Sequence, residues 1–572
     1  MGKKIVWDNS NIIESYPGVT TPLTFSFIRD MYRVVYIQFC QLLGLSNKIL
    51  TDNKTVFENM LGLLRGRVFY NLRSWYQVLS LLPGYQINAE FMENMMGVKE
   101  KFELKDQYVQ GKWSARWQMF ITILKMIKSF WRLPKDRDQF LTFVDQTIAE
   151  YKAIDFEAAS PEALMNHYHD FEKILTKQWN PPLVNDFFAM IYFGVFKKLI
   201  VKYIGEEHPH IHNDLLAHSN DIISVQPMIQ SLTLAKSITK NIKQYSFFLN
   251  EDESTIWNEL ENGRFPKLYE DIKNYLNKFG ERCLGELKLE TISYNQAPEK
   301  FIKILQSYIQ NPSSFNSLNK GKSKVLRAKS QQIVADKIGH TFFKKRIFNY
   351  FMNKTRELVS NRENLRFERT RGFGIVRDIF SAMGVAFEKR NLIKNDRDIF
   401  YLTKEEIFDF IKGTSILPDL KKTIEDRKMQ YQNFEKDTCV PERVTTYGCV
   451  NDQLIFEKTA DSLEKGDLTG IACCPGVIES EIIVVNSPDQ VSDIGGKIMV
   501  TASTDPGWVS LFPSSSAILV ERGSLLSHSA IVARELGIPC IVAVNGLLNR
   551  LKTGDIVRMD GSTGQIKIIS ND

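Results

Sequence analysis

Apolar residues in roughly the first 450 positions recur every three or four residues, which predicts a mostly helical region. One such stripe consists of Ile28, Met31, Tyr32, Val35, Phe39 and Leu42, and another of Leu268, Ile272, Tyr275, Leu276 and Phe279. This spacing puts the apolar side chains on one face of a helix, so we expect both stripes to be buried core.

The pattern changes near residue 468 to short β-rich runs separated by glycine and proline. The runs that we predict as strands are LTGIACC, EIIVVN, KIMVTA, SAILVE, CIVAV and DIVRM, while HSAIVAREL (528–536) is predicted as a helix. The preceding stretch DTCVPERVTTYGCVNDQ lacks helical periodicity and contains proline and glycine, which is typical of a linker. The sequence therefore predicts a multidomain α plus α/β protein. A large helical domain (1–436) is followed by a linker or hinge (437–466) and a small β/β/α domain (467–572).

Composition narrows the class of protein. With 572 residues, 43% hydrophobic and 24% charged, the chain has an ordinary globular balance, and its seven cysteines form no CxxC pair. The first residues contain no signal-peptide core, and no stretch is apolar enough to span a membrane. We expect a cytoplasmic protein without a membrane partner.

Charge divides the chain in the same place as the hydrophobic pattern. Residues 451–572 hold 9 Lys and Arg against 15 Asp and Glu, net −6, which leaves 64 against 52, net +12, for the rest. A basic domain raises the question of nucleic acid, but no nucleic-acid-binding motif accompanies the charge, so we expect no such partner. The charge instead suits an anionic substrate or the acidic domain itself.

Candidate chemistry is concentrated in GSLLSHSAIVARELGIPCIV, residues 523–542. Gly523 permits a tight approach after a strand, Ser527 suits a helix N-cap, and His528 falls in the first turn. Unpaired N–H groups and the helix dipole favour an anion there, and hydroxyls of Ser524, Ser527 and Ser529 add donors. Free imidazole is largely neutral near pH 7, as a nitrogen nucleophile must be. His528 is thus a candidate phosphoryl carrier, and a helix-capping histidine is the alternative.

The same segment closely resembles the phosphohistidine swivelling domain of phosphoenolpyruvate-utilising enzymes. The resemblance continues through LTGIACCPGVIESEIIVV and GKIMVTASTDPGWVSLFPSSSAILVE, and it implies that His528 accepts a phosphoryl group. Two positions depart from the family, since Val520 replaces a usual threonine and Ser524 a usual glycine. Cys474 stands where serine is common, and for Cys473 and Cys474 buried packing is favoured over a redox site.

The helical part resembles the antibiotic-binding domain of the rifampicin phosphotransferase family. The matching stretches are IIESYPGVTTPLTFS, NKFGERCLGELKL, RENLRFERTRGFGIVRDIF and DIFYLTKEEI, in the family's order. Within RENLR, Arg362 and Arg366 lie four residues apart and match an Arg-Glu-x-x-basic motif at the family's transfer site, which makes them acceptor-site candidates. A solvated basic helix face is the alternative.

The resemblance also implies a donor. Family members carry an ATP-grasp domain that this sequence does not show, and no GxxxxGK[ST] loop is present. We therefore expect a separate ATP-grasp protein, holding ATP and Mg²⁺, to charge His528, which then passes the phosphoryl group to a small-molecule acceptor. No pyruvate-binding barrel follows residue 572, which counts against phosphoenolpyruvate synthesis by this chain alone.

Several alternatives stay open at this point. The chain could be phosphoenolpyruvate synthase-like, a phosphocarrier that relays phosphate between proteins, or a non-catalytic relative. For Arg282 and Glu286, site architecture and an internal ion pair are equally good explanations. His208, His210 and His212 alternate as metal ligands can, but a polar loop is favoured, and we predict no metal site.

Overall fold

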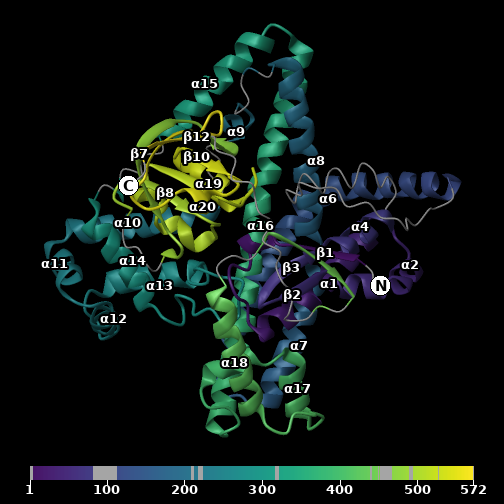
Figure 1. Cartoon of the computed structure of the whole chain (residues 1–572), viewed down its shortest axis with the longest axis vertical. Coiled ribbons are helices and arrows are strands. Elements are labelled where there is room, and N and C mark those ends of the chain that lie inside the picture. Colours follow the sequence, from purple (N-terminus) through teal and green to yellow (C-terminus); the bar gives the residue numbers. More distant parts are fainter. Residues whose placement is uncertain are drawn as a thin grey trace. The chain divides into compact units, whose positions relative to one another are not determined.

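The protein is described from a computed structural model of the chain (Figure 1). The structure describes residues 4–81, 112–205, 207, 211–216, 223–312, 314–315, 321–437, 441–448, 450, 467–488, 494–525 and 527–570. These residues divide into two compact units that are discontinuous in sequence. Unit 1 comprises residues 1–187, 287–290 and 368–459, and unit 2 comprises residues 188–286, 291–367 and 460–572. Two long helices, α8 (Asn180–Tyr203) and α16 (Phe342–Lys389), contribute residues to both units.

Unit 1 combines helices with a small antiparallel sheet. Its helices are α1 (Pro22–Leu42), α2 (Asn47–Asp52), α3 (Lys54–Glu58), α4 (Leu72–Leu81), α6 (Lys112–Lys152), α7 (Pro161–Gln178), α17 (Lys404–Lys412) and α18 (Leu420–Lys436). The sheet has the order β2-β3-β1-β4, from β1 (Lys4–Asp8), β2 (Leu61–Leu64), β3 (Arg67–Asn71) and β4 (Arg443–Tyr447). The predicted helical stripe of residues 28–42 lies in α1, and its first member, Ile28, is completely buried.

The four-stranded sheet was not predicted, because the sequence analysis identified only helices in the mostly helical region. Three of its strands come from the first 71 residues, and β4 lies inside the predicted linker 437–466. Trp7 stabilises the sheet because its indole Nε1 donates a 2.9 Å hydrogen bond to Thr446 Oγ1 in the interior. A side chain at Gly62 would collide with the Trp7 ring at 2.3 Å, so glycine leaves the space that the ring occupies. Residues 451–466 lie outside the described part, and the hinge there stays a prediction.

Unit 2 contains a helical part and the β-rich C-terminal part. The helices before α16 are α9 (Ile211–Leu216), α10 (Gln226–Lys240), α11 (Ile242–Asn250), α12 (Glu253–Glu261), α13 (Pro266–Phe279), α14 (Glu299–Gln310) and α15 (Gly321–Ile338). The second predicted stripe lies in α13, and all five of its residues are buried, as expected. Tyr275 of this stripe stacks on Phe301 of α14, with ring centroids 4.1 Å apart. The second stripe is therefore core, whereas in the first stripe only Ile28 is fully buried and its other five residues are partly buried.

The C-terminal part is a mixed eight-stranded sheet with helices α19 (His528–Leu536) and α20 (Leu547–Arg550). Its strands are β5 (Leu468–Thr469), β6 (Ile471–Cys474), β7 (Val477–Val484), β8 (Ile498–Thr501), β9 (Ala517–Val520), β10 (Cys540–Val542), β11 (Ile556–Asp560) and β12 (Gln565–Ser570). They are ordered β5-β12-β11-β7-β8-β9-β10-β6, and the neighbours from β7 to β10 are parallel. The predicted fold class, a large helical part followed by a small α/β domain, is confirmed.

Both faces of the central strands are covered, which explains their continuous apolar sequences. Ala517 and Leu519 of β9 belong to one apolar cluster, and Ile518 and Val520 belong to another. The second cluster also contains Ile531 of α19, so this helix packs on the Ile518 and Val520 face. The prediction found every central strand and α19 but missed β12 (Figure 1).

Candidate functional site

The N-terminus of α19 follows strand β9 after a short connection that includes Gly523. Gly523 has a φ of +148°, a backbone conformation that L-residues rarely adopt, so glycine suits this position for its conformational freedom. Ser527 is the N-cap, and its Oγ accepts a hydrogen bond from the backbone N–H of Ala530 at 3.4 Å. His528 is the first residue of the helix, where backbone N–H groups and the dipole favour negative charge.

The His528 side chain is nearly enclosed, with 11% of it exposed. Its Nδ1 faces Glu363 of α16, 3.8 Å from Oε2, whereas Nε2 is buried and forms no hydrogen bond with a described residue. A carboxylate beside Nδ1 favours a proton on that nitrogen and leaves the lone pair on Nε2. The geometry therefore leaves the Nε2 lone pair without a hydrogen bond from a described residue.

Glu363 is a buried carboxylate held in its ionised form. Ser224 Oγ donates a 2.8 Å hydrogen bond to Glu363 Oε2, and the residue is only 5% exposed. Burial by itself raises the pKa of Glu363. The imidazole of His528 and the guanidinium groups of Arg362 and Arg366 outweigh burial, and together they hold this pKa well below its usual range. Both predicted acceptor-site arginines, on the same helix α16, thus act electrostatically on the carboxylate that faces His528.

The helix that carries His528 is anchored at its other end. Arg534, in the last turn of α19, donates to Asn213 Oδ1 of α9 at 2.9 Å and to the Leu525 carbonyl at 3.2 Å. Asn213 Nδ2 in turn donates to the Ala472 carbonyl of β6 at 3.4 Å. These contacts fix the direction of α19 against the helical part of unit 2.

A second contact joins the β-rich part to the turn that follows α13. Asp505 accepts two hydrogen bonds of 2.8 Å, one from the Gly507 N–H within its own turn and one from the N–H of Gly285. Tyr308 Oη of α14 donates to the Ser510 carbonyl at 3.0 Å. Gly507 packs so closely that a Cβ there would lie 2.5 Å from the Leu284 nitrogen. The β-rich part therefore packs against the helical part of unit 2 through hydrogen bonds to backbone groups and a close approach of the two backbones.

The remaining sequence candidates have clear structural positions. The Ser524 carbonyl accepts from the Ser527 N–H at 3.0 Å, and Ser529 is buried with its Oγ 3.1 Å from Ser527 Oγ. Arg282 and Glu286 form a buried ion pair with a 2.7 Å contact, the second of the two explanations offered from sequence.

The structure also shows where the cysteine and histidine candidates outside the His528 site lie, apart from those outside the described residues. Cys473 and Cys474 are buried in β6, and burial raises the pKa of the Cys474 thiol to about 12, so packing rather than redox chemistry describes them. His212 is buried in α9, while His208 and His210 lie outside the described residues. Over the described ranges, no group of three or more His, Cys, Asp or Glu side chains is arranged to hold a metal ion.

Sequence reasoning did not select Glu363, Ser224 or Asn213. Glu363 lies inside the RENLR motif, but its pairing with His528 depends on the fold, since the two are far apart in sequence. Its position one residue after Arg362, in a motif already selected, was the available signal. Ser224 and Asn213 belong to short elements without any motif, and no sequence signal marks them.

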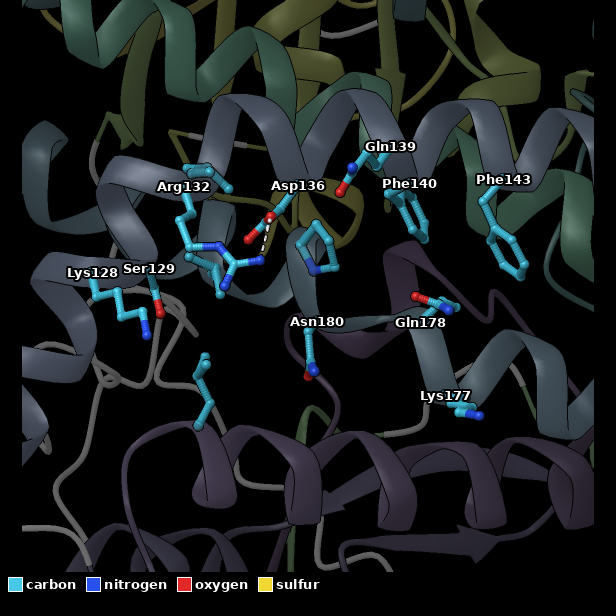
Figure 2. Close-up of a pocket in the computed structure, with 14 residues that line it drawn as sticks. Lys128, Ser129, Arg132, Asp136, Gln139, Phe140, Phe143, Lys177, Gln178 and Asn180 are labelled. Atoms are coloured by element: carbon cyan, nitrogen blue, oxygen red, sulfur yellow. Dashed lines mark hydrogen bonds and ion pairs between the residues drawn. The ribbon is translucent and has the colours of Figure 1, made fainter.

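A pocket of about 550 Å³ lies in unit 1 between α1, α6, α7 and the start of α8 (Figure 2). Its lining is mixed, with Leu42, Leu133, Phe140, Phe143, Pro181 and Val184 as apolar residues and Lys128, Arg132, Asp136 and Lys177 as charged ones. Arg132 forms an ion pair with Asp136 at 3.3 Å, drawn as a dashed line in Figure 2. The pocket is partly open to solvent, and its lining is about as polar as it is apolar.

Two models of known protein families match parts of this chain. Residues 494–564 match the PEP-utilising enzyme mobile domain, and residues 183–363 match the rifampicin phosphotransferase fourth domain. The C-terminal part is thus a mobile domain of phosphoenolpyruvate-utilising type, as the sequence resemblance implied. The second match ends at Glu363, the residue that faces His528.

Curated relatives point in the same direction. The chain is 27% identical over 331 residues to the rifampicin phosphotransferase of Bacillus cereus, covering 56% of this chain and 36% of that protein. The Bacillus subtilis rifampicin phosphotransferase is 26% identical over 53% of this chain and 34% of its own length. An uncharacterised phosphotransferase of Bacillus subtilis is 37% identical over 102 residues, which are 18% of this chain and 12% of that protein. The chain thus spans about a third of the length of the two rifampicin phosphotransferases.

Proposed function

We propose that this protein is a phosphotransferase component in which His528 carries a phosphoryl group to a small-molecule acceptor. The observation that carries the proposal is the state of the imidazole. It sits at a helix N-terminus, with Nδ1 facing a buried carboxylate and Nε2 without a hydrogen-bond partner among the described residues. This is the arrangement that a nitrogen nucleophile for phosphoryl transfer needs.

The chemistry balances in two steps. In the first, Nε2 attacks the β-phosphorus of ATP, the bond from this phosphorus to the oxygen shared with the α-phosphorus breaks, and AMP leaves. One water molecule cleaves the anhydride between the β- and γ-phosphoryl groups, so the products are phosphohistidine, AMP and inorganic phosphate. In the second, an acceptor hydroxyl attacks the same phosphorus, the P–N bond breaks, and the hydroxyl loses its proton. Charge on the transferring group must be neutralised in both steps, and Arg362 and Arg366 beside Glu363 are suited to the second.

The residues around the ring have distinct roles in this proposal. Glu363 acts as a positioning residue, since it orients the imidazole and selects the tautomer with a free Nε2. Ser527 caps α19 and, with the other first-turn N–H groups, supports the negative charge of the phosphoryl group. The buried setting excludes water, which protects the P–N bond from hydrolysis.

We favour a small-molecule acceptor over a protein-to-protein relay because two of the relatives reported above are phosphotransferases named for a small molecule. Unit 1 also contains a partly open pocket of about 550 Å³ with apolar and charged walls, which is a separate candidate binding place for an organic compound. Phosphorylation of rifampicin is the activity of those relatives. We propose only that the acceptor here is a small hydroxyl compound.

For the donor, we propose a separate ATP-grasp protein that binds ATP and Mg²⁺. Purified full-length chain is incubated with β-labelled ATP, with and without the candidate ATP-grasp protein, and the acid-labile protein label is measured. Label is expected only with the partner, and His528→Ala abolishes it. His340→Ala is the matched control, because His340 is an exposed histidine of unit 2 and its loss leaves the label unchanged.

Two outcomes separate the parts of the proposal. Label on His528 without any added protein refutes the separate donor but keeps the phosphohistidine. Label that survives His528→Ala, or label that never forms with any candidate donor, refutes the carrier role itself. Glu363→Gln distinguishes positioning from folding, because it keeps the shape of the side chain while the rate of labelling falls about 10- to 100-fold.

A further inference from the structure

Helix α6 (Lys112–Lys152) of unit 1 carries an apolar stripe that points away from the protein interior. Phe120, Ile123, Leu124 and Ile127 are each about half exposed, and Trp131 is 79% exposed. At 3.6 residues per turn these five side chains fall within an arc of about 100°. The face of α6 that packs inward is a different one, which contains the buried Met126 and Leu133.

The stripe is large for the surface of a soluble protein. A large apolar side chain presents about 200 Å², so five that are half exposed or more leave on the order of 500 Å² of apolar surface in one patch. Patches of this size are at the upper end for monomers and usually mark a contact surface. We therefore expect the stripe to be a binding surface.

Charge around the stripe identifies the kind of partner. Residues 120–135 contain four cations, Lys125, Lys128, Arg132 and Lys135, and no acidic residue. On the helix these four lie together on one flank of the stripe. Lys128 and Arg132 also line the pocket of unit 1, and among ion pairs of the described residues only Arg132 is paired, with Asp136 at 3.3 Å. An apolar face beside a basic flank is the pattern of a helix that lies in the interface of an anionic membrane.

A second copy of the chain fits this surface less well. Two stripes related by a two-fold axis would bring the same four cations toward one another, and like charges across an interface disfavour association. An anionic lipid surface complements the flank instead, since each lysine or arginine near it is attracted to lipid phosphates.

We propose that the outward face of α6 docks on an anionic lipid bilayer, with the apolar stripe at the headgroup boundary and the basic flank on the phosphates. The contact is peripheral, because none of the helices in the described part of the chain is long and apolar enough to cross a membrane. The sequence expectation of no membrane partner rested on the missing spanning segment and did not consider such a contact. The proposal is independent of the chemistry at His528.

Vesicle co-sedimentation of the full chain tests the proposal. Vesicles of phosphatidylcholine alone are compared with an equal mixture of phosphatidylcholine and phosphatidylglycerol, at low and at physiological salt. Binding is expected with the mixed vesicles, with little on the neutral ones. The triple variant Ile123→Ser, Ile127→Ser, Trp131→Ser is expected to lower binding at least about tenfold, and Lys125→Gln about fivefold.

The controls distinguish membrane docking by α6 from unfolding and from nonspecific binding of exposed apolar residues. Ile416→Ser is the matched control, because Ile416 is 95% exposed in unit 1 and lies outside α6, so binding stays as in the unchanged chain. Equal binding to both vesicle types, or full binding by the triple variant, overturns the proposal, as does the absence of any binding. Light scattering that shows a dimer converted to a monomer by the triple variant also overturns it, by assigning the stripe to self-association.

Discussion

Gly507 offers a way to separate docking of the β-rich part from its folding. The residue lies in the 3₁₀ turn Pro506–Ser510, and its φ is not in the left-handed region, so alanine is compatible with the local backbone. A Cβ at this position would lie 2.5 Å from the Leu284 nitrogen and 2.6 Å from the Leu284 Cα. Both are backbone atoms and cannot rotate away. Gly507→Ala therefore forces the turn away from the segment after α13.

The cost of this displacement follows from the contacts that it breaks. The turn must move by about 1 Å to bring the new Cβ to an ordinary van der Waals distance from the Leu284 backbone. The 2.8 Å hydrogen bond from the Gly285 N–H to Asp505 then exceeds hydrogen-bond length, and the 3.0 Å bond from Tyr308 to Ser510 weakens with it. A bond to a charged group contributes about 1.5–3 kcal/mol and a neutral one about 1 kcal/mol, so docking loses roughly 3 kcal/mol. The equilibrium constant for docking then falls on the order of a hundredfold.

Hydrogen exchange at the Gly285 amide reports the undocked population, because this amide exchanges when its hydrogen bond to Asp505 is open. Its rate is expected to rise about a hundredfold in Gly507→Ala, in line with that loss of about 3 kcal/mol. The amides of β8 and β9 should keep their protection. The matched control is Gly194→Ala in unit 2, because a Cβ at Gly194 meets nothing within 4 Å.

Two results would refute the reasoning. Unchanged exchange at Gly285 would show that the contact between Asp505 and the segment after α13 does not hold the β-rich part against the helical part of unit 2. Loss of protection throughout β8 and β9 would show that Gly507 serves folding rather than docking. If the proposed function is right, labelling of His528 by the donor persists in Gly507→Ala, because the substitution does not touch α19.

Three further predictions concern buried groups of unit 2. Ser527→Ala removes the N-cap of α19, so the first-turn amides should exchange about fivefold faster, as expected for a loss of about 1 kcal/mol. Cys474 should resist iodoacetamide near pH 8 until the protein unfolds, because burial raises the pKa of its thiol to about 12; rapid labelling of the folded chain would contradict this. Arg282→Met should lower the free energy of unfolding, measured in urea, by about 3–5 kcal/mol, and adding Glu286→Leu should restore much of it.

The parts of the fold that sequence predicted are those determined by local signals. Helix α19 was placed at its observed bounds, because a serine cap, strong helix formers and a following glycine all act within a few residues. The strands from β7 to β11 were found for the same reason, since glycine and proline bound short apolar runs. The stripe of α13 was identified as core from its spacing alone.

The parts that sequence missed depend on contacts between distant segments. Strand β1 is only five residues long and pairs with β3 and β4, so nothing near Lys4–Asp8 marks it as part of a sheet. The carboxylate that faces His528 comes from a different element, α16, and only the folded chain shows which residue of RENLR points there. The identity of His528 as carrier came from a family resemblance and stays a prediction until label is found on it.

The sheet of unit 1 also has a consequence for how the chain is made on the ribosome. Strand β4 completes the sheet beside β1, and Arg443 neutralises the buried Asp8 at 3.0 Å. Because β4 is synthesised more than 430 residues after β1, translation at about 5–20 residues per second leaves that edge of β1 open for roughly 20–90 seconds. During this interval the edge can pair with another nascent chain. Synthesis from closely spaced ribosomes is therefore the condition under which this protein is most exposed to aggregation.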